Sequence, residues 1–193
     1  MKSTTLFSSL ASVVALATAT ANDVMTIENF ENGSTKMEWR AINDTVMGGV
    51  SEGGPAVSKD ETMVFSGSIS FENQGGFSSI RTSGASLDLG EFAGVELRVK
   101  GDGRKYYLTV RNPDNRRLAY WSPVQPEAGK WVTLRVPFSS FYPTFFGQKV
   151  DGKTLDITKV NSIGFMIYDK KDGPFTIEFD WIKAYKEQQS FLY

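Results

Sequence analysis

The sequence of 193 residues contains no histidine and no cysteine. These two absences exclude a Ser-His-Asp triad, a cysteine nucleophile, an ordinary zinc site, a thiolate-ligated cluster and a histidine-ligated haem. The chemistry that remains is that of carboxylate, lysine and tyrosine side chains, or of a magnesium or calcium ion held by oxygens. We therefore expect a binding protein rather than an enzyme, with no cofactor. The alternative to the absence of a cofactor is a structural calcium ion.

The chain also lacks an excess of positive charge, since 21 Lys and Arg stand against 22 Asp and Glu. Nucleic acid is therefore not an expected partner, because its phosphates attract strongly basic surfaces. Long hydrophobic runs are missing as well. The apolar run at residues 10–17 is shorter than the roughly 20 residues that a membrane-spanning helix needs.

This short apolar run has the pattern of a secretory signal peptide. Lys2 provides a positively charged start, and the small residues Ala19-Thr20-Ala21 follow the run. We predict that residues 1–21 are a signal peptide cleaved before Asn22, and that the protein is secreted or periplasmic. A mitochondrial transit peptide is the alternative, because the segment is rich in Ser and Thr and has no acidic residue, although it also has no arginine.

Apolar and polar residues alternate along most of residues 22–193, which indicates half-buried β-strands. The pattern is clearest at residues 95–100, 106–111, 132–136, 163–167 and 175–181. In the last segment it places Trp181 on the core face. Gly53-Gly54-Pro55 is predicted to be a turn, and Gly101-Asp102-Gly103-Arg104 a hairpin connection. With weaker segments near 24–30, 36–41, 63–71 and 77–81, we predict nine or ten strands in one all-β domain, a monomeric jelly-roll β-sandwich.

Two motifs stand out in this domain. The first is Asn43-Asp44-Thr45-Val46-Met47-Gly48-Gly49-Val50-Ser51, and the second is Gly75-Gly76-Phe77-Ser78-Ser79-Ile80-Arg81. Together with the Pro137-Phe138 and Asp180-Trp181 elements in the same order, they resemble the complex I intermediate-associated protein 30 family. The resemblance implies a galactose-binding-domain-like jelly roll related to carbohydrate-binding modules. Mitochondrial members of that family act as assembly chaperones for respiratory complex I. The sequence departs from the family pattern at residues 145–149, where aromatic residues and Lys149 stand in place of an arginine.

The first motif is too polar and too rich in glycine for a core, and we predict that it forms a binding loop. The candidate partner-binding residues of the two motifs are Asn43, Asp44, Met47, Gly48, Gly49, Ser51, Gly76, Phe77 and Ser79. In the alternative interpretation, Asn43 and Asp44 hydrogen-bond to backbone and hold a turn, while Met47 fills a gap in the sandwich.

Arginines provide a second candidate surface. Alternation points Arg81 and Arg98 away from the core, and Arg104 follows Asp102 in the next turn. If their strands are neighbours, these side chains form a polar patch suited to carboxylates, phosphates or sugar hydroxyls. The alternative is a solvated face with salt bridges between strands.

Aromatic residues outside the alternating pattern provide a third candidate. Exposed rings can stack on sugars or contact a partner chain, and Trp121 is the ring we select. The alternative is a small satellite core beneath a loop. The rings in question are Tyr107, Tyr120, Trp121, Trp131, Tyr142, Phe145 and Phe146.

The predicted function is a non-catalytic protein-binding module of the assembly-chaperone type, acting on an unknown protein partner. A carbohydrate-binding module is the first alternative. A carboxylate-dependent glycosidase or lyase is weaker and depends on Glu178 and Asp180, of which Asp180 is also the candidate calcium ligand. Asn32 and Asn43 both lie in N-glycosylation sequons, so a glycan on Asn43 would block the predicted loop.

Overall fold

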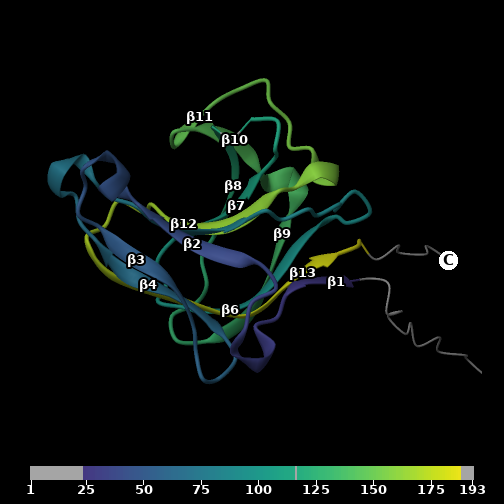
Figure 1. The fold of residues 1–193 in the computed structure, drawn as a ribbon, viewed down its shortest axis with the longest axis horizontal. Helices are drawn as coiled ribbons and strands as arrows, with labels where there is room; N and C mark the ends of the chain where they lie inside the picture. The colour runs from purple at the N-terminus through teal and green to yellow at the C-terminus, as the bar shows by residue number, and fades with distance from the viewer. Residues whose placement is uncertain (1–23, 116, 188–193) are drawn as a thin grey trace, which may run out of the picture.

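The computed structural model describes residues 24–115 and 117–187, which form two antiparallel β-sheets stacked as layers (Figure 1). Sheet A has the strand order β3-β4-β13-β6-β9, and β1 also pairs with β13. Sheet B has the order β11-β10-β8-β7-β12-β5-β2. The predicted all-β jelly-roll sandwich is therefore confirmed. The predicted signal peptide lies outside the described residues.

The described residues contain thirteen strands and five short 3-10 helices, with no α-helix among them. The strands are β1 (Val24–Glu28), β2 (Glu38–Asn43), β3 (Glu52–Val57), β4 (Met63–Ile69), β5 (Ser78–Ser83), β6 (Gly94–Gly101), β7 (Tyr106–Arg111), β8 (Leu118–Val124), β9 (Trp131–Pro137), β10 (Tyr142–Phe145), β11 (Gln148–Lys149), β12 (Ser162–Ile167) and β13 (Gly173–Tyr185). The 3-10 helices are η1 (Glu31–Gly33), η2 (Asp44–Met47), η3 (Glu72–Gln74), η4 (Phe138–Ser140) and η5 (Ile157–Lys159).

The hydrophobic core lies between the two sheets and is built by alternation along the strands. On β6, for example, Val95, Leu97 and Val99 are buried while the residues between them are half-buried on the outer face. Aromatic rings join the two layers at the centre. Phe165 of β12 packs on Phe179 of β13 with ring centroids 4.0 Å apart. Burial of apolar side chains such as these two rings stabilises the fold.

The alternation breaks at one point of β13, and this corrects the predicted position of Trp181. A register shift lies between Phe179 and Trp181 in the pairing with β6. Because of this bulge, Ile182 follows Phe179 as the next fully buried residue, and Trp181 is only half-buried on the outer side. An extra residue in one strand reverses the face of every residue that follows it.

Two predicted turns also differ from the structure. Gly53, Gly54 and Pro55 lie within β3, an edge strand of sheet A. Proline is tolerated in an edge strand, because such a strand has a neighbour on one side only and its other side needs no N–H donor. Gly53 is needed there because a Cβ would approach Ser78 Oγ to 2.3 Å. The turn after β6 is not a hairpin, because β6 belongs to sheet A and β7 to sheet B. It carries the chain from one layer to the other.

Phe165 is fully buried in this core. We expect Phe165→Ala to lower the free energy of unfolding by about 3–5 kcal/mol, because the cavity removes contacts with both sheets. Urea unfolding followed by fluorescence measures the change. As a control, Phe146→Ala removes a ring that is 75% exposed and is expected to change stability by less than about 0.5 kcal/mol. Equal effects of the two variants would contradict the predicted core.

Candidate functional site

The two sequence motifs meet at the carboxylate of Asp44, which is fully buried. Its Oδ1 accepts a hydrogen bond from the backbone N–H of Ser51 at 2.9 Å. Its Oδ2 accepts from the N–H groups of Gly76 at 2.6 Å and of Phe77 at 3.2 Å. A carboxylate that accepts several backbone N–H bonds is well solvated by the protein itself. Asp44 therefore holds together the β2–β3 and β4–β5 connections, and we call this cluster of Asp44, Ser51, Gly76 and Phe77 the Asp44 junction.

Glycine makes this close approach possible. A Cβ at Gly49 would lie 2.4 Å from Asp44 Oδ1, and a Cβ at Gly75 would lie 2.5 Å from Oδ2. Gly48 ends η2 with a positive φ of 91°, a conformation that glycine adopts without strain. Both connections thus supply N–H donors and space for the single carboxylate of Asp44.

Three further polar residues of the motifs, Asn43, Ser78 and Ser79, also make internal contacts. Asn43 Nδ2 donates to the carbonyl oxygen of Gly53 at 3.0 Å, and Ser78 Oγ donates to Asn43 Oδ1 at 2.7 Å. Ser79 Oγ donates to the carbonyl oxygen of Ile42 at 2.8 Å. The interpretation of Asn43 and Asp44 as turn-holding residues agrees with these bonds.

The loop that the junction supports presents apolar side chains to solvent. Val46 is 70% exposed, Met47 is 64% exposed and Val50 is 43% exposed. The suggestion that Met47 fills a gap in the sandwich is therefore wrong. We call residues 44–50 the Met47 loop. Its backbone is fixed by buried polar contacts, while its apolar side chains are free to contact another molecule.

Burial opposes ionisation of Asp44, but the hydrogen bonds from Ser51, Gly76 and Phe77 outweigh it and hold the pKa of this carboxyl below its ordinary value of 3.8. The charged form is therefore the one that stabilises the fold. This contribution is complete above the ordinary pKa and is lost as the pH falls through the lower pKa of the folded state.

We expect Asp44→Asn to lower the free energy of unfolding by about 3 kcal/mol near pH 7, because an amide cannot accept all three N–H bonds. The difference from the wild type should shrink below about pH 4 as Asp44 itself becomes protonated. Urea unfolding at several pH values measures both effects. Asp114→Asn, at an exposed position, is the matched control. A difference between the wild type and Asp44→Asn that does not depend on pH would contradict this role.

The predicted arginine patch does not form, because its members lie on different sheets. Arg81 is on β5 of sheet B, and Arg98 is on β6 of sheet A, so both point outward but on opposite sides of the sandwich. Arg98 Nε instead lies 3.3 Å from Asp180 Oδ2. For Arg98 the alternative of a solvated face with salt bridges agrees with the structure.

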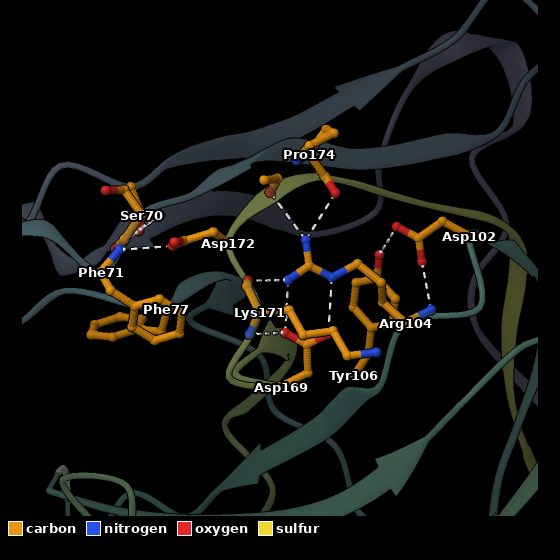
Figure 2. A network of polar contacts seen from close by, with 12 residues as sticks. Ser70, Phe71, Phe77, Asp102, Arg104, Tyr106, Asp169, Lys171, Asp172 and Pro174 are labelled. Carbon is orange, nitrogen blue, oxygen red and sulfur yellow. Dashed lines mark hydrogen bonds and ion pairs between the residues drawn. The ribbon is translucent and has the colours of Figure 1, made fainter.

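Arg104 is hydrogen-bonded within the protein on all sides of its guanidinium, as Figure 2 shows. Its Nε and Nη2 donate to the two carboxylate oxygens of Asp169 at 2.9 and 2.7 Å. Its Nη1 donates to the carbonyl oxygens of Gly173 and Pro174, and Nη2 also donates to that of Lys171. All five guanidinium N–H donors are therefore used within the chain. Arg104 fixes the loop between β12 and β13 and has no donor left for a ligand.

Asp102 completes this network from the other side. Its Oδ1 accepts from the N–H of Arg104 at 2.9 Å, and its Oδ2 accepts from Tyr106 Oη at 2.9 Å and from the N–H of Thr176 at 2.8 Å. Burial raises the pKa of Asp169, but the hydrogen bond and the charge of Arg104 outweigh burial and lower it overall. The network joins the β6–β7 turn to the β12–β13 loop and to β13 itself.

We expect Arg104→Lys to lower the free energy of unfolding by about 3 kcal/mol, since an ammonium group cannot bridge both oxygens of Asp169 and reach three carbonyls. Thermal or urea unfolding tests this. Arg98→Lys is the matched control, because the Arg98 side chain is 41% exposed and forms a single ion pair. Equal stability of the Arg104→Lys variant and the control would show that the network contributes little.

Trp121 lies on β8 but is only 6% exposed. Its ring lies 5.1 Å from that of Tyr107 and 6.2 Å from that of Tyr168, centroid to centroid. This agrees with the satellite-core interpretation. Phe145 and Phe146 at the β10–β11 connection are the exposed rings of this region, at 38% and 75%.

The two candidate catalytic carboxylates lie in ion pairs on sheet A. Glu178 accepts a hydrogen bond from Thr62 Oγ1 at 2.6 Å and pairs with Lys100, and Asp180 pairs with Arg98. Burial raises the pKa of Glu178, but Lys100 and Thr62 lower it overall, which is unfavourable for a general acid. Among the described residues, no group of three or more acidic side chains is arranged to hold a metal ion.

Two buried polar contacts carry no recognisable signal in the sequence. Glu28 is a buried carboxylate that accepts hydrogen bonds from the N–H groups of Lys36 and Met37 and from Trp39 Nε1. The sequence also gives no sign that Asp169 pairs with Arg104, because the two residues lie 65 positions apart. Within residues 24–115 and 117–187, no helix is long and apolar enough to cross a membrane.

Comparison with known structures first defines the class. The chain is similar to the family 11 carbohydrate-binding module of a cellulosomal cellulase from Clostridium thermocellum, with a TM-score of 0.64 and 20% identity over 88% of this chain and 98% of that one. At this identity the likeness is one of fold alone, and the class of protein that it defines is the jelly-roll β-sandwich.

The family follows from sequence similarity. The model of the complex I intermediate-associated protein 30 family matches residues 28–179, so the chain belongs to that family. It is 33% identical over 108 residues to the mitochondrial complex I intermediate-associated protein 30 of Mus musculus, covering 53% of this chain and 33% of that protein. It is 27% identical to an uncharacterized protein of Schizosaccharomyces pombe over 81% of each chain. The chain thus spans about a third of the length of the first curated relatives that it matches.

Proposed function

We propose that this chain is a non-catalytic, assembly-type module that binds a protein partner through the Met47 loop. The observation that carries the proposal is the contrast between the buried polar junction and the exposed apolar side chains that it supports. Val46, Met47 and Val50 remain in contact with solvent although the chain has a large core in which apolar residues are stabilised. Contiguous exposed apolar side chains on a fixed loop are typical of protein contact surfaces.

The loop has two properties that favour binding. Its backbone is held by Asp44, so little conformational entropy is lost when a partner binds. Met47 has a flexible and polarisable side chain, which adapts to irregular partner surfaces. A fixed backbone with one adaptable apolar side chain suits recognition rather than turnover.

Family membership supports an assembly role for this module. The relatives' names associate them with complex I intermediates and with mitochondria, and both associations are proposals for this chain. They favour the mitochondrial alternative for the N-terminal segment over secretion or periplasmic export. A respiratory complex I assembly intermediate is the partner class that this reasoning favours.

The test replaces Met47 with a photo-reactive phenylalanine analogue in the full chain and identifies cross-linked proteins in the source cells. The same analogue at Phe146, which is exposed on a different loop, is the matched control. We expect position 47 to yield a discrete partner that position 146 does not. With the purified partner, Met47→Asp should weaken binding at least about tenfold, because a charge would be buried in an apolar contact.

Equal cross-linking from the two positions, or full binding by Met47→Asp, would contradict the proposed surface. A fluorescent fusion of the full chain, imaged beside mitochondrial and secretory markers, tests the localisation independently.

The carbohydrate-binding alternative has a specific observation in its favour, since the modules with the same fold include one solved with a tetrasaccharide. Stacking on sugars requires an accessible ring, however, and Trp121 is buried against Tyr107 and Tyr168. The protein-binding proposal is therefore the better supported of the two.

A further inference from the structure

Two arginines lie close together on the outer face of sheet B, away from the core. Arg81 on β5 is directly opposite Gly164 on β12, and Arg111 on β7 is opposite Ser162 of the same strand. The two side chains therefore flank β12 from its two neighbouring strands. We call them the arginine pair.

The surroundings of Arg81 leave its charge uncompensated. Its guanidinium forms no hydrogen bond or ion pair with any residue in the described part of the chain, although the side chain is half-buried. Gly164 places no side chain beside it, and a Cβ there would come within 2.7 Å of Arg81 Cβ. The space over β12 next to Arg81 is therefore kept clear of side-chain atoms from that strand.

Arg111 adds a second positive charge to the same face. Its Nη1 donates to the carbonyl oxygen of Leu118 at 3.0 Å, which holds the guanidinium against β8. Burial, together with the positive charge of Arg81, lowers the pKa of Arg111 to about 10. Burial also lowers the pKa of Arg81. Both shifts indicate positive charges that are partly removed from water, and the shift of Arg111 also reflects repulsion by Arg81.

The carboxylate in the neighbouring row of this face does not pair with Arg81. Glu38 on β2 accepts two hydrogen bonds from Arg40 and one from Ser83 Oγ. Arg104 provides the contrast, because an internal carboxylate and three carbonyls use all its donors. A half-buried arginine without such partners is suited to an anion that comes from another molecule.

We propose that the arginine pair binds the side-chain carboxylates of an acidic segment in the protein partner. This inference rests on the proposed function and assigns the partner a charge. A protein carboxylate is favoured over a sugar acid because Trp121 on the same face is buried and offers no stacking surface. Strand β2 also lies beside β5 and runs directly from Arg40 into the Met47 loop, so one partner surface can cover the arginine pair and the loop.

The experiment measures fluorescence anisotropy of labelled hexaglutamate with the full chain at an ionic strength of about 0.15 M, where nonspecific attraction is screened. Hexaglutamine is the neutral reference peptide. Arg81→Gln is compared with Arg98→Gln, which removes the same charge from the opposite sheet. We expect hexaglutamate to bind and hexaglutamine not to bind. Arg81→Gln should weaken hexaglutamate binding about tenfold, while Arg98→Gln should change it less than about twofold.

Arg81→Lys provides a second measure, because it keeps the charge but loses the two-pronged geometry, and it should fall between the wild type and Arg81→Gln. Unchanged thermal unfolding of Arg81→Gln would confirm that the loss is one of binding. Equal losses from Arg81→Gln and Arg98→Gln, or no binding by the wild type, would overturn the inference. Tighter binding of oligogalacturonate than of hexaglutamate would overturn it in favour of a glycan.

The same variants separate this inference from the proposed function. If the partner identified through Met47 binds Arg81→Gln as tightly as the wild type, the function stands and the acidic contact is wrong. If hexaglutamate binding depends on Arg81 but Met47 yields no partner, the anion site stands and the loop proposal is wrong.

Discussion

The arrangement of the loops at one end of the sandwich depends on a single buried negative charge. Isolated in a protein interior, a carboxylate is strongly unfavourable, so Asp44 is stable only while Ser51, Gly76 and Phe77 donate their N–H groups to it. Those donors come from two connections that are distant in sequence. The charge therefore fixes the two connections relative to each other. It also fixes the backbone that carries the exposed side chains of Val46, Met47 and Val50.

The Arg104 network applies the same principle with opposite sign. A guanidinium with 11% side-chain exposure is surrounded by an internal carboxylate and backbone carbonyls, and it fixes the loop before β13. Arg81 shares the residue type but lacks the partners. Arg104 thus stabilises the fold, whereas Arg81 is available for recognition. The number of internal hydrogen-bond partners, and not exposure alone, distinguishes the two arginines.

Alternation of apolar residues was sufficient to predict the sandwich, because each clear strand buries one face, as Val95, Leu97 and Val99 do. Both motifs could be recognised in the sequence, but the hydrogen bonds from Gly76 and Phe77 to Asp44 could not, because these residues lie 32 and 33 positions apart. Sheet membership could not be predicted, since alternation does not reveal which strands pair. Arg81 and Arg98 were therefore grouped on one surface although they lie on opposite sides. The bulge before Trp181 was also invisible, because one extra residue leaves the local composition unchanged.

Strand β13 has a consequence for how the chain reaches its native state. It pairs with β1, β4 and β6, so the centre of sheet A is built from segments at both extremes of the described chain (Figure 1). During synthesis, β1, β4 and β6 lack the strand that they all pair with until residues 173–185 leave the ribosome. Folding with such distant contacts is slow, and the unpaired edges are exposed in the meantime. The nascent polypeptide is thus exposed to aggregation through these edges until its last long strand is available.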